Sequence, residues 1–240
     1  MRGLVLAVLT ARAAIVALAA LGCSTGQEPF ALPIMVVGSG TTALTAGDHT
    51  LVVTEASLSA GPFWFCASTA ASPDLCPVAV AESLAVVTVD GRDATERVAG
   101  SLSAMPLTAR SVMYDLGISW HGTEPTARLS ADATLGRSAR FRVTATRGAN
   151  TFHVIADIDV KPQYQGARSV HGATTPVDLA QVKGLHVRFD PAPCLRSLDW
   201  AALEALATTS TPVALVKGTP AHSALVFGIT GACAPQFEWR

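Results

Sequence analysis

Histidine and carboxylate side chains recur at every second position in two segments, and they are the strongest candidates for chemistry. Within residues 150–160 they alternate with apolar residues at three positions, His153, Asp157 and Asp159. Residues 184–190 repeat the alternation with three further polar side chains, His186, Arg188 and Asp190. Imidazole combined with carboxylate suits zinc, copper or non-haem iron. If the two segments are neighbouring strands, His153, Asp157 and His186 predict a metal site; otherwise they form the solvated face of two strands.

Aromatic side chains are a second kind of candidate. In Phe63-Trp64-Phe65, strand alternation separates Trp64 from its two neighbours. An exposed Trp64, or Trp120 at the end of residues 112–120, would offer an apolar contact to a glycan, a peptide or another envelope protein. The competing interpretation is core packing against a disulfide at the adjacent Cys66.

The sequence contains no short catalytic motif. It has no Gly-x-Ser-x-Gly elbow, and Val37-Gly38-Ser39-Gly40 does not supply one. The zinc-protease His-Glu-x-x-His, phosphate-binding, dinucleotide-binding and calcium-binding patterns are also missing. We therefore predict that the protein is not an enzyme. A secreted hydrolase with a Ser-His-Asp triad assembled from distant residues is kept as an alternative.

Alternating apolar residues predict the strands that must position these candidates. The clearest segments are residues 112–120, 139–146 and 152–160, and Arg147-Gly148-Ala149-Asn150 predicts the turn of an antiparallel hairpin between the last two. Weaker strands are expected at 34–37, 49–58, 62–66, 84–89, 126–134, 184–190, 213–217 and 223–229.

A single helix is expected, over residues 198–207. Ser197 can cap it, Asp199 lies in its first turn, and Trp200, Leu203 and Ala207 share one apolar stripe. Many short strands separated by turn residues predict a mainly β fold. We expect one domain over residues 34–240, an antiparallel β-sandwich or a barrel-like sheet.

The first 22 residues have the features of an export signal. Arg2 precedes an apolar stretch, and Arg12 interrupts the run that a membrane-spanning helix would need. The segment Ala20-Leu21-Gly22-Cys23 that follows resembles the lipobox of bacterial lipoproteins. This resemblance implies cleavage before Cys23, diacylation of Cys23 and anchoring of the protein through the lipid. It also implies outer-membrane sorting, because Ser24 follows the modified cysteine. Residues 23–33 would then form a tether.

Composition excludes some partners. The chain after residue 22 has 218 residues, enough for one large β domain. Two of the 17 basic residues lie in the leader. The chain after residue 22 therefore has 15 basic and 18 acidic residues, and its net charge is about −3. Because no basic stripe is present, nucleic-acid binding is not expected.

Four cysteines remain besides Cys23. Export permits disulfides, and four cysteines allow three pairings. We favour Cys66–Cys76 and Cys194–Cys233, since each pair lies within one half of the chain. The two loops would contribute about 3 and about 4 kcal/mol of stability. A thiolate metal site is the alternative, although no Cys-x-x-Cys spacing occurs.

These features predict a lipid-anchored protein of the bacterial cell envelope that serves as a non-catalytic binding or structural module. Its expected partners are the membrane, through the N-terminal lipid, and another envelope protein or a glycan. No cofactor is expected. The alternatives are a metal-binding lipoprotein that uses His153, Asp157 and His186, and the hydrolase.

Overall fold

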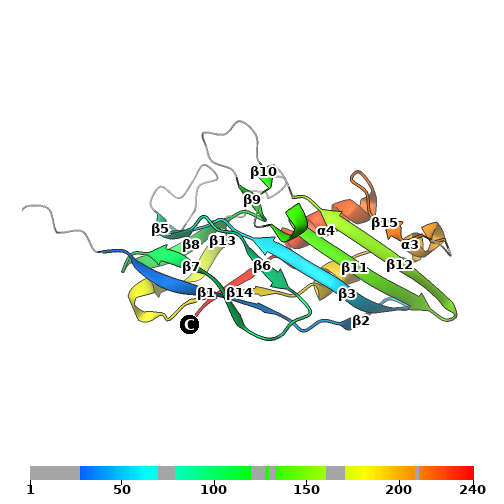
Figure 1. Ribbon diagram of the computed structural model, residues 1–240, viewed down its shortest axis with the longest axis horizontal. Coiled ribbons are helices and arrows are strands. Elements are labelled where there is room, and N and C mark those ends of the chain that lie inside the picture. Colours follow the sequence, from blue (N-terminus) through cyan, green and yellow to red (C-terminus); the bar gives the residue numbers. More distant parts are fainter. Residues whose placement is uncertain (1–27, 70–78, 120–127, 130–132, 161–170, 209–210) are drawn as a thin grey trace, which may run out of the picture.

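The computed structural model describes residues 28–69, 79–119, 128–129, 133–160, 171–208 and 211–240. Most of these residues lie in the strands of two sheets, which run along the long axis of the molecule (Figure 1). The predicted mainly β fold is therefore confirmed. Within the described ranges, no helix is long and apolar enough to span a bilayer.

The larger sheet has eight strands and is curled towards a barrel. In spatial order the strands are β13 (His171–Asp178), β8 (Thr108–Tyr114), β4 (Phe63–Cys66), β5 (Ala79–Ser83), β7 (Arg97–Ala104), β1 (Phe30–Gly38), β14 (Leu185–Phe189) and β16 (Gln236–Trp239). Phe237 of the last strand contacts Phe63 and Tyr114 near the other end of the order, with ring centroids 5.7 and 5.0 Å apart. The curl brings these aromatic side chains into one core.

The second sheet carries the candidate residues of the β11–β12 hairpin. Its strands are ordered β15 (Val213–Ala214), β12 (Asn150–Ile158), β11 (Ala139–Arg147), β3 (His49–Ala60) and β2 (Ala43–Ala46), and β6 (Val87–Asp90) also pairs with β3. Arg147 pairs with Asn150, and Gly148 in the turn has a φ of +59°, a conformation that suits glycine. The predicted hairpin is therefore confirmed.

Side chains from both sheets form one hydrophobic core. Phe141 of β11 and Phe189 of β14 are both buried, and their ring centroids lie 6.5 Å apart. In β11 and β12 the inward positions are buried and the outward positions are partly or fully exposed. This alternation is the period-two pattern of the sequence.

Several predicted boundaries of strands are wrong. Strand β1 begins at Phe30, so residues 30–33 belong to a strand and not to a tether. The segment 112–120 is not one strand, because β8 ends at Tyr114 and Gly117 takes a φ of +74° before the short strand β9 (Ile118–Ser119), which pairs with β10 (Arg128–Leu129). The strand pairing is largely antiparallel, and β1 with β14 and β12 with β15 are parallel pairs.

The described residues contain three α-helices, where one was predicted: α2 (Ala192–Arg196), α3 (Trp200–Leu206) and α4 (Pro220–Ile229). The predicted helix is α3, but Asp199 caps it by accepting a hydrogen bond from Ala202 N at 2.9 Å, so it begins later than Ser197 would place it. Two short 3₁₀ segments, at Thr134–Gly136 and Leu179–Gln181, complete the described elements.

Helix α4 occupies a segment that was predicted to be a strand, residues 223–229. Thr219 caps the helix by accepting from His222 N at 3.3 Å, and Pro220 occupies the first turn, where a missing N–H is harmless. The buried residues follow helical spacing, at His222, Leu225, Val226 and Ile229. The buried residues of this segment therefore line one helical stripe.

A disulfide joins Cys194 of α2 to Cys233, which follows α4, and confirms this predicted pair. Cys66 is also disulfide-bonded, whereas its predicted partner Cys76 lies outside the described residues, as does Cys23. The disulfide between Cys194 and Cys233 fastens α4 to α2.

Gly228 allows these two helices to approach closely. A Cβ atom at this position would lie 2.5 Å from Cys194 Sγ. Gly228→Ala is therefore expected to lower the free energy of unfolding by about 1–3 kcal/mol, measured by urea denaturation. Ser223→Ala, on the same helix, is the control and should stay within about 0.5 kcal/mol of the wild type. Equal stability of the two variants would contradict the close approach.

Candidate binding site

The structure does not bring together the three residues of the predicted metal site. His153 and Asp157 share the outer face of β12, as predicted, but His186 lies on β14 in the other sheet. His186 is buried, and its Nδ1 lies 2.7 Å from Glu96 Oε2. Nor does the described part of the chain contain another group of three His, Cys, Asp or Glu side chains placed to hold a metal. A metal-binding role remains a prediction without a site in these residues.

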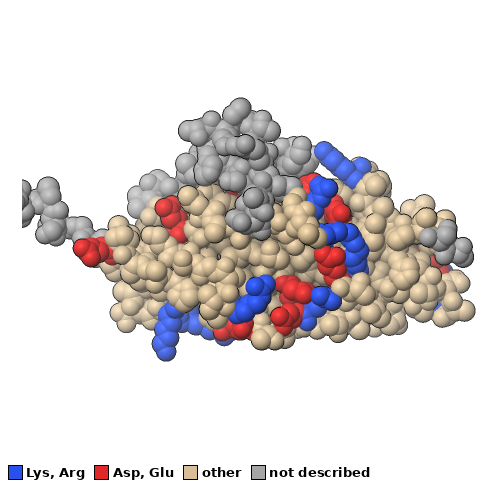
Figure 2. Space-filling model, viewed as in Figure 1, with Lys and Arg blue, Asp and Glu red and all other residues tan. Residues whose placement is uncertain are grey.

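The outer face of β12 instead carries a network of opposite charges. Asp157 Oδ1 accepts hydrogen bonds from Arg140 Nε at 2.9 Å and from Arg142 Nη1 at 3.1 Å. Glu55 of β3 lies within 3.9 Å of the same two guanidinium groups. Burial alone would raise the pKa of Asp157, but the hydrogen bonds from Arg142 and Arg140 outweigh it and lower that pKa. Figure 2 shows basic and acidic side chains gathered over these strands, as expected for a solvated sheet face.

Trp64 points away from the core, as the alternation predicts. Phe63 and Phe65 are buried, while Trp64 is half-buried and packs against Cys66 and Met113. This packing matches the interpretation of an aromatic side chain set against a cystine. Trp120, the other predicted binding residue, lies outside the described residues.

A pocket of about 640 Å³ lies between the edge of β12 and helix α4, and we call it the β12–α4 pocket. Its walls are formed by three parts of the chain: Ile155, Asp157 and Asp159 from the β12 side, residues 214–218, and His222, Ser223, Val226 and Phe227 from α4. The volume falls in the usual range of small-ligand sites, about 300–1,000 Å³. Figure 1 shows β15 and α4 along the β12 side of the sheet.

Two large apolar side chains in the pocket wall are exposed. Phe227 is 69% exposed and Val216 is 57% exposed, although both belong to otherwise apolar segments. Leaving two such groups in water beside a concavity is unfavourable unless a partner covers them, since burying a phenylalanine side chain contributes roughly 1.5–3 kcal/mol. The pocket is therefore suited to an apolar group.

Glu204 joins helix α3 to the tip of the β11–β12 hairpin. Its carboxylate lies 2.7 Å from Arg147 Nη2 and 3.0 Å from His49 Nε2, and it accepts a hydrogen bond from Asn150 Nδ2 at 3.0 Å. The Asn150 hydrogen bond lowers the pKa of Glu204; burial acts against it, and His49 and Arg147 reinforce it. These contacts hold α3 against the tip of the β11–β12 hairpin, and β15 follows soon after in the chain.

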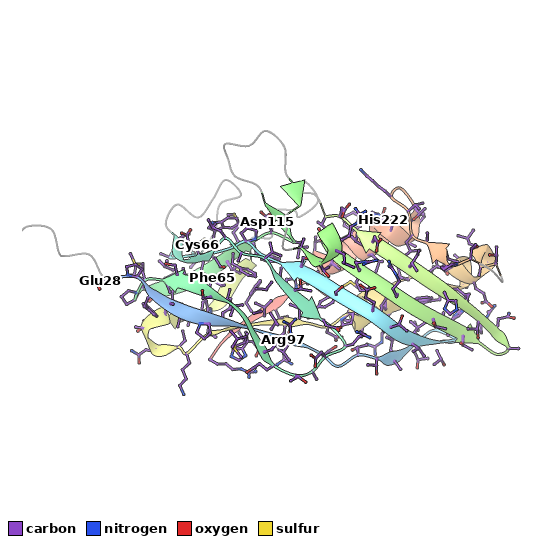
Figure 3. All side chains as sticks on the ribbon, in the orientation of Figure 1. Glu28, Phe65, Cys66, Arg97, Asp115 and His222 are labelled. Carbon is purple, nitrogen blue, oxygen red and sulfur yellow. A yellow bond between two sulfur atoms is a disulfide. The ribbon has the colours of Figure 1, made fainter. Side chains whose placement is uncertain are left out.

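His222 is a titratable group in the pocket wall whose pKa is shifted. Figure 3 places it on α4 close to the end of β12. Burial lowers the pKa of its imidazole; the nearby Asp159 raises it and Lys217 lowers it further. No side-chain hydrogen bond joins His222 to another described residue. The pocket thus presents a neutral imidazole at neutral pH.

This lowered pKa predicts how stability depends on pH. Because the folded state holds the His222 proton more weakly than the unfolded state, its contribution is complete above the unfolded pKa and declines as the pH falls through that value. We expect His222→Gln to lose less stability than the wild type between about pH 7 and pH 5. Urea denaturation at each pH measures the difference. Parallel losses in the two proteins would contradict the assignment.

Sequence reasoning did not find this pocket. Asp157 and Asp159 were singled out, but Val216 and Phe227 lie in segments that were predicted to be strands, and His222 lies between those two segments. The available signal was Thr219-Pro220 followed by Leu225, Val226 and Ile229, whose helical spacing after such a cap indicates a helix.

Comparisons with known proteins add little to this description. No protein-family model matches the chain, and no curated protein matches it. Among solved structures, MbnP from Methylosinus trichosporium is similar over 72% of this chain and 78% of its own, with 14% sequence identity and a TM-score of 0.35. A similarity of this size carries no argument about the function of this chain.

Proposed function

We propose that this protein is a lipid-anchored binding module of the bacterial cell envelope and that it binds its ligand in the β12–α4 pocket. The observation that carries the proposal is the exposure of Phe227 and Val216 in the wall of a pocket of about 640 Å³. The disulfide between Cys194 and Cys233 supports an oxidising compartment, where such bonds persist. The lipobox-like segment before Cys23 supports the anchor.

A neutral apolar dye, N-phenyl-1-naphthylamine, tests the pocket. Phe227→Ala is expected to weaken dye binding about tenfold, because losing the contact with one aromatic side chain removes roughly 1.5 kcal/mol of burial. Fluorescence titration measures the dissociation constant. Leu206→Ala on α3 is the matched control, since Leu206 is also 69% exposed but lies outside the pocket wall. Equal affinities for the two variants would place the dye elsewhere and overturn the proposal.

Hydrolysis is a second candidate function, favoured by one observation. A neutral imidazole in a pocket is the kind of group that serves as a general base, and Ser223 lines the same pocket. Against it, no described hydroxyl is hydrogen-bonded to the imidazole of His222, whereas an activated nucleophile lies within about 3.2 Å of its base. Hydrolysis of 4-nitrophenyl esters that disappears in both His222→Gln and Ser223→Ala would favour the hydrolase over the binding module.

A further inference from the structure

The edge of β12 inside the pocket carries backbone groups that the sheet does not use. In an antiparallel ladder, successive residues point their N–H and C=O groups alternately towards the two neighbouring strands. Ser138 N donates to Ile158 O at 2.9 Å, so the backbone C=O of Ile158 points towards β11. Leu215 N donates to Ile155 O at 2.9 Å, so the backbone C=O of Ile155 points towards β15. By the same alternation, the N–H and C=O of Asp157 point to the β15 side.

Strand β15 ends before it reaches Asp157. It pairs only with Val154 and Ile155, and it is the outermost strand of this sheet in the described part of the chain. The chain then turns away from the sheet, and Thr219 N donates to Val216 O at 3.1 Å to close this turn. The pocket lies where β15 would continue, and Asp157 lies in its wall.

We propose that the β12–α4 pocket binds an extended peptide segment of another protein, which adds a short strand to β12 by pairing with the backbone of Asp157. The inference rests on the proposed function of the pocket. Strand addition gives a peptide its affinity through main-chain hydrogen bonds and its specificity through pockets for alternate side chains. Phe227 and Val226 supply the apolar contact for one such side chain.

The shape of the site favours a peptide over a second copy of this chain. Pairing between two copies would need an open, accessible edge on each molecule. Here Asp157 lies inside a concave site, with α4 and residues 214–218 forming its other walls. A peptide segment could enter this concave site, whereas the edge of a second folded copy would have to pass its walls.

N-methylated peptides test the backbone pairing directly. The probe is an acetylated, amidated peptide of five residues with alternating valine and threonine, titrated into the intact protein and followed by calorimetry. Two further versions carry N-methyl groups on the amides of one edge or of the other edge. One of them should bind about tenfold more weakly than the parent, because its pairing hydrogen bonds are blocked. The other should stay within about threefold. Any other pattern overturns the proposal.

Two variants of Asp157 provide a test on the protein itself. Asp157→Pro removes the carboxylate together with a backbone N–H that the ladder does not use, and proline is accepted at such edge positions. We expect it to weaken binding of the unmethylated peptide about tenfold. Asp157→Ala, which loses the same carboxylate but keeps the N–H, should stay within about threefold of the wild type. Equal affinities for the two variants would overturn the proposal. If Asp157→Pro does not fold, the N-methylated series on the wild type decides.

The outcomes separate this inference from the proposed function. If dye binding depends on Phe227 but peptide binding is unchanged by N-methylation, the pocket is supported as a binding site and strand addition is rejected. Loss of the Phe227 dependence rejects the pocket itself. Dimerisation in sedimentation experiments that Asp157→Pro abolishes would identify a second copy as the occupant and would also overturn the proposed peptide.

Discussion

Replacing both Cys194 and Cys233 by alanine is expected to lower the free energy of unfolding by about 4 kcal/mol. The two cysteines are 39 residues apart, and their bond restricts the unfolded chain while it fastens α2 to the end of α4. Both side chains are buried, so the variant also loses core packing. Urea denaturation followed by circular dichroism measures the change.

Arg196→Ala is the control for this variant, because Arg196 belongs to α2 but is exposed. It should change the free energy of unfolding by less than about 0.5 kcal/mol. Dye binding should also weaken in the double cysteine variant, since α4 forms one wall of the pocket. A stability within about 1 kcal/mol of the wild type would show that the disulfide does not restrain the fold as described.

Phe141→Ala is expected to destabilise the protein by about 3–5 kcal/mol. The side chain is 2% exposed and lies between the two sheets, where its ring approaches Phe189 of the opposite sheet. Its removal would leave a cavity that neither sheet can fill without moving. Thermal and urea denaturation measure the loss, and a decrease below about 1 kcal/mol would be inconsistent with a shared core.

Thr146→Ala on the same strand is the matched control. Thr146 is on the outer face of β11, where its hydroxyl lies 3.1 Å from that of Thr151. We expect its replacement to change stability by about 0.5 kcal/mol or less. The contrast between the two positions tests the alternation of β11, because they differ in the face that they occupy.

The sequence predicted the local structure best where one face of a strand is buried and the other is solvated. The hairpin of β11 and β12 satisfies this condition along its length, and Gly148 marks its turn. Strand β7 was not predicted, because its first residues, such as Arg97 and Val98, are both exposed and give no alternation. The bounds of the strand within residues 108–116 were not predicted either, for the opposite reason. Consecutive residues from Ser111 onward are all buried, so the segment shows no alternation of buried and exposed side chains.

Apart from the β11–β12 hairpin, the neighbours of the strands could not be predicted. His153 and His186 both lie on strands, but pairing is decided by contacts far apart in sequence, and it puts these strands in different sheets. Helix α4 was mistaken for a strand because Val226, Phe227 and Ile229 favour extended structure when considered singly. Burial of a helical stripe under the disulfide outweighs that preference. The pocket depends on the neighbours of β12 and on the helical structure of α4. It was therefore not predicted from the sequence.

The most direct test of the β12–α4 pocket is a nuclear magnetic resonance titration of the protein with N-phenyl-1-naphthylamine. If the dye binds in the pocket, we expect the largest changes in amide chemical shift in the pocket wall, at Asp157, Gly218, His222 and Phe227. Leu206 and Val98, which are exposed outside it, should show little change. Shifts that instead concentrate around Trp64, or that spread evenly over exposed apolar residues, would contradict binding in the pocket.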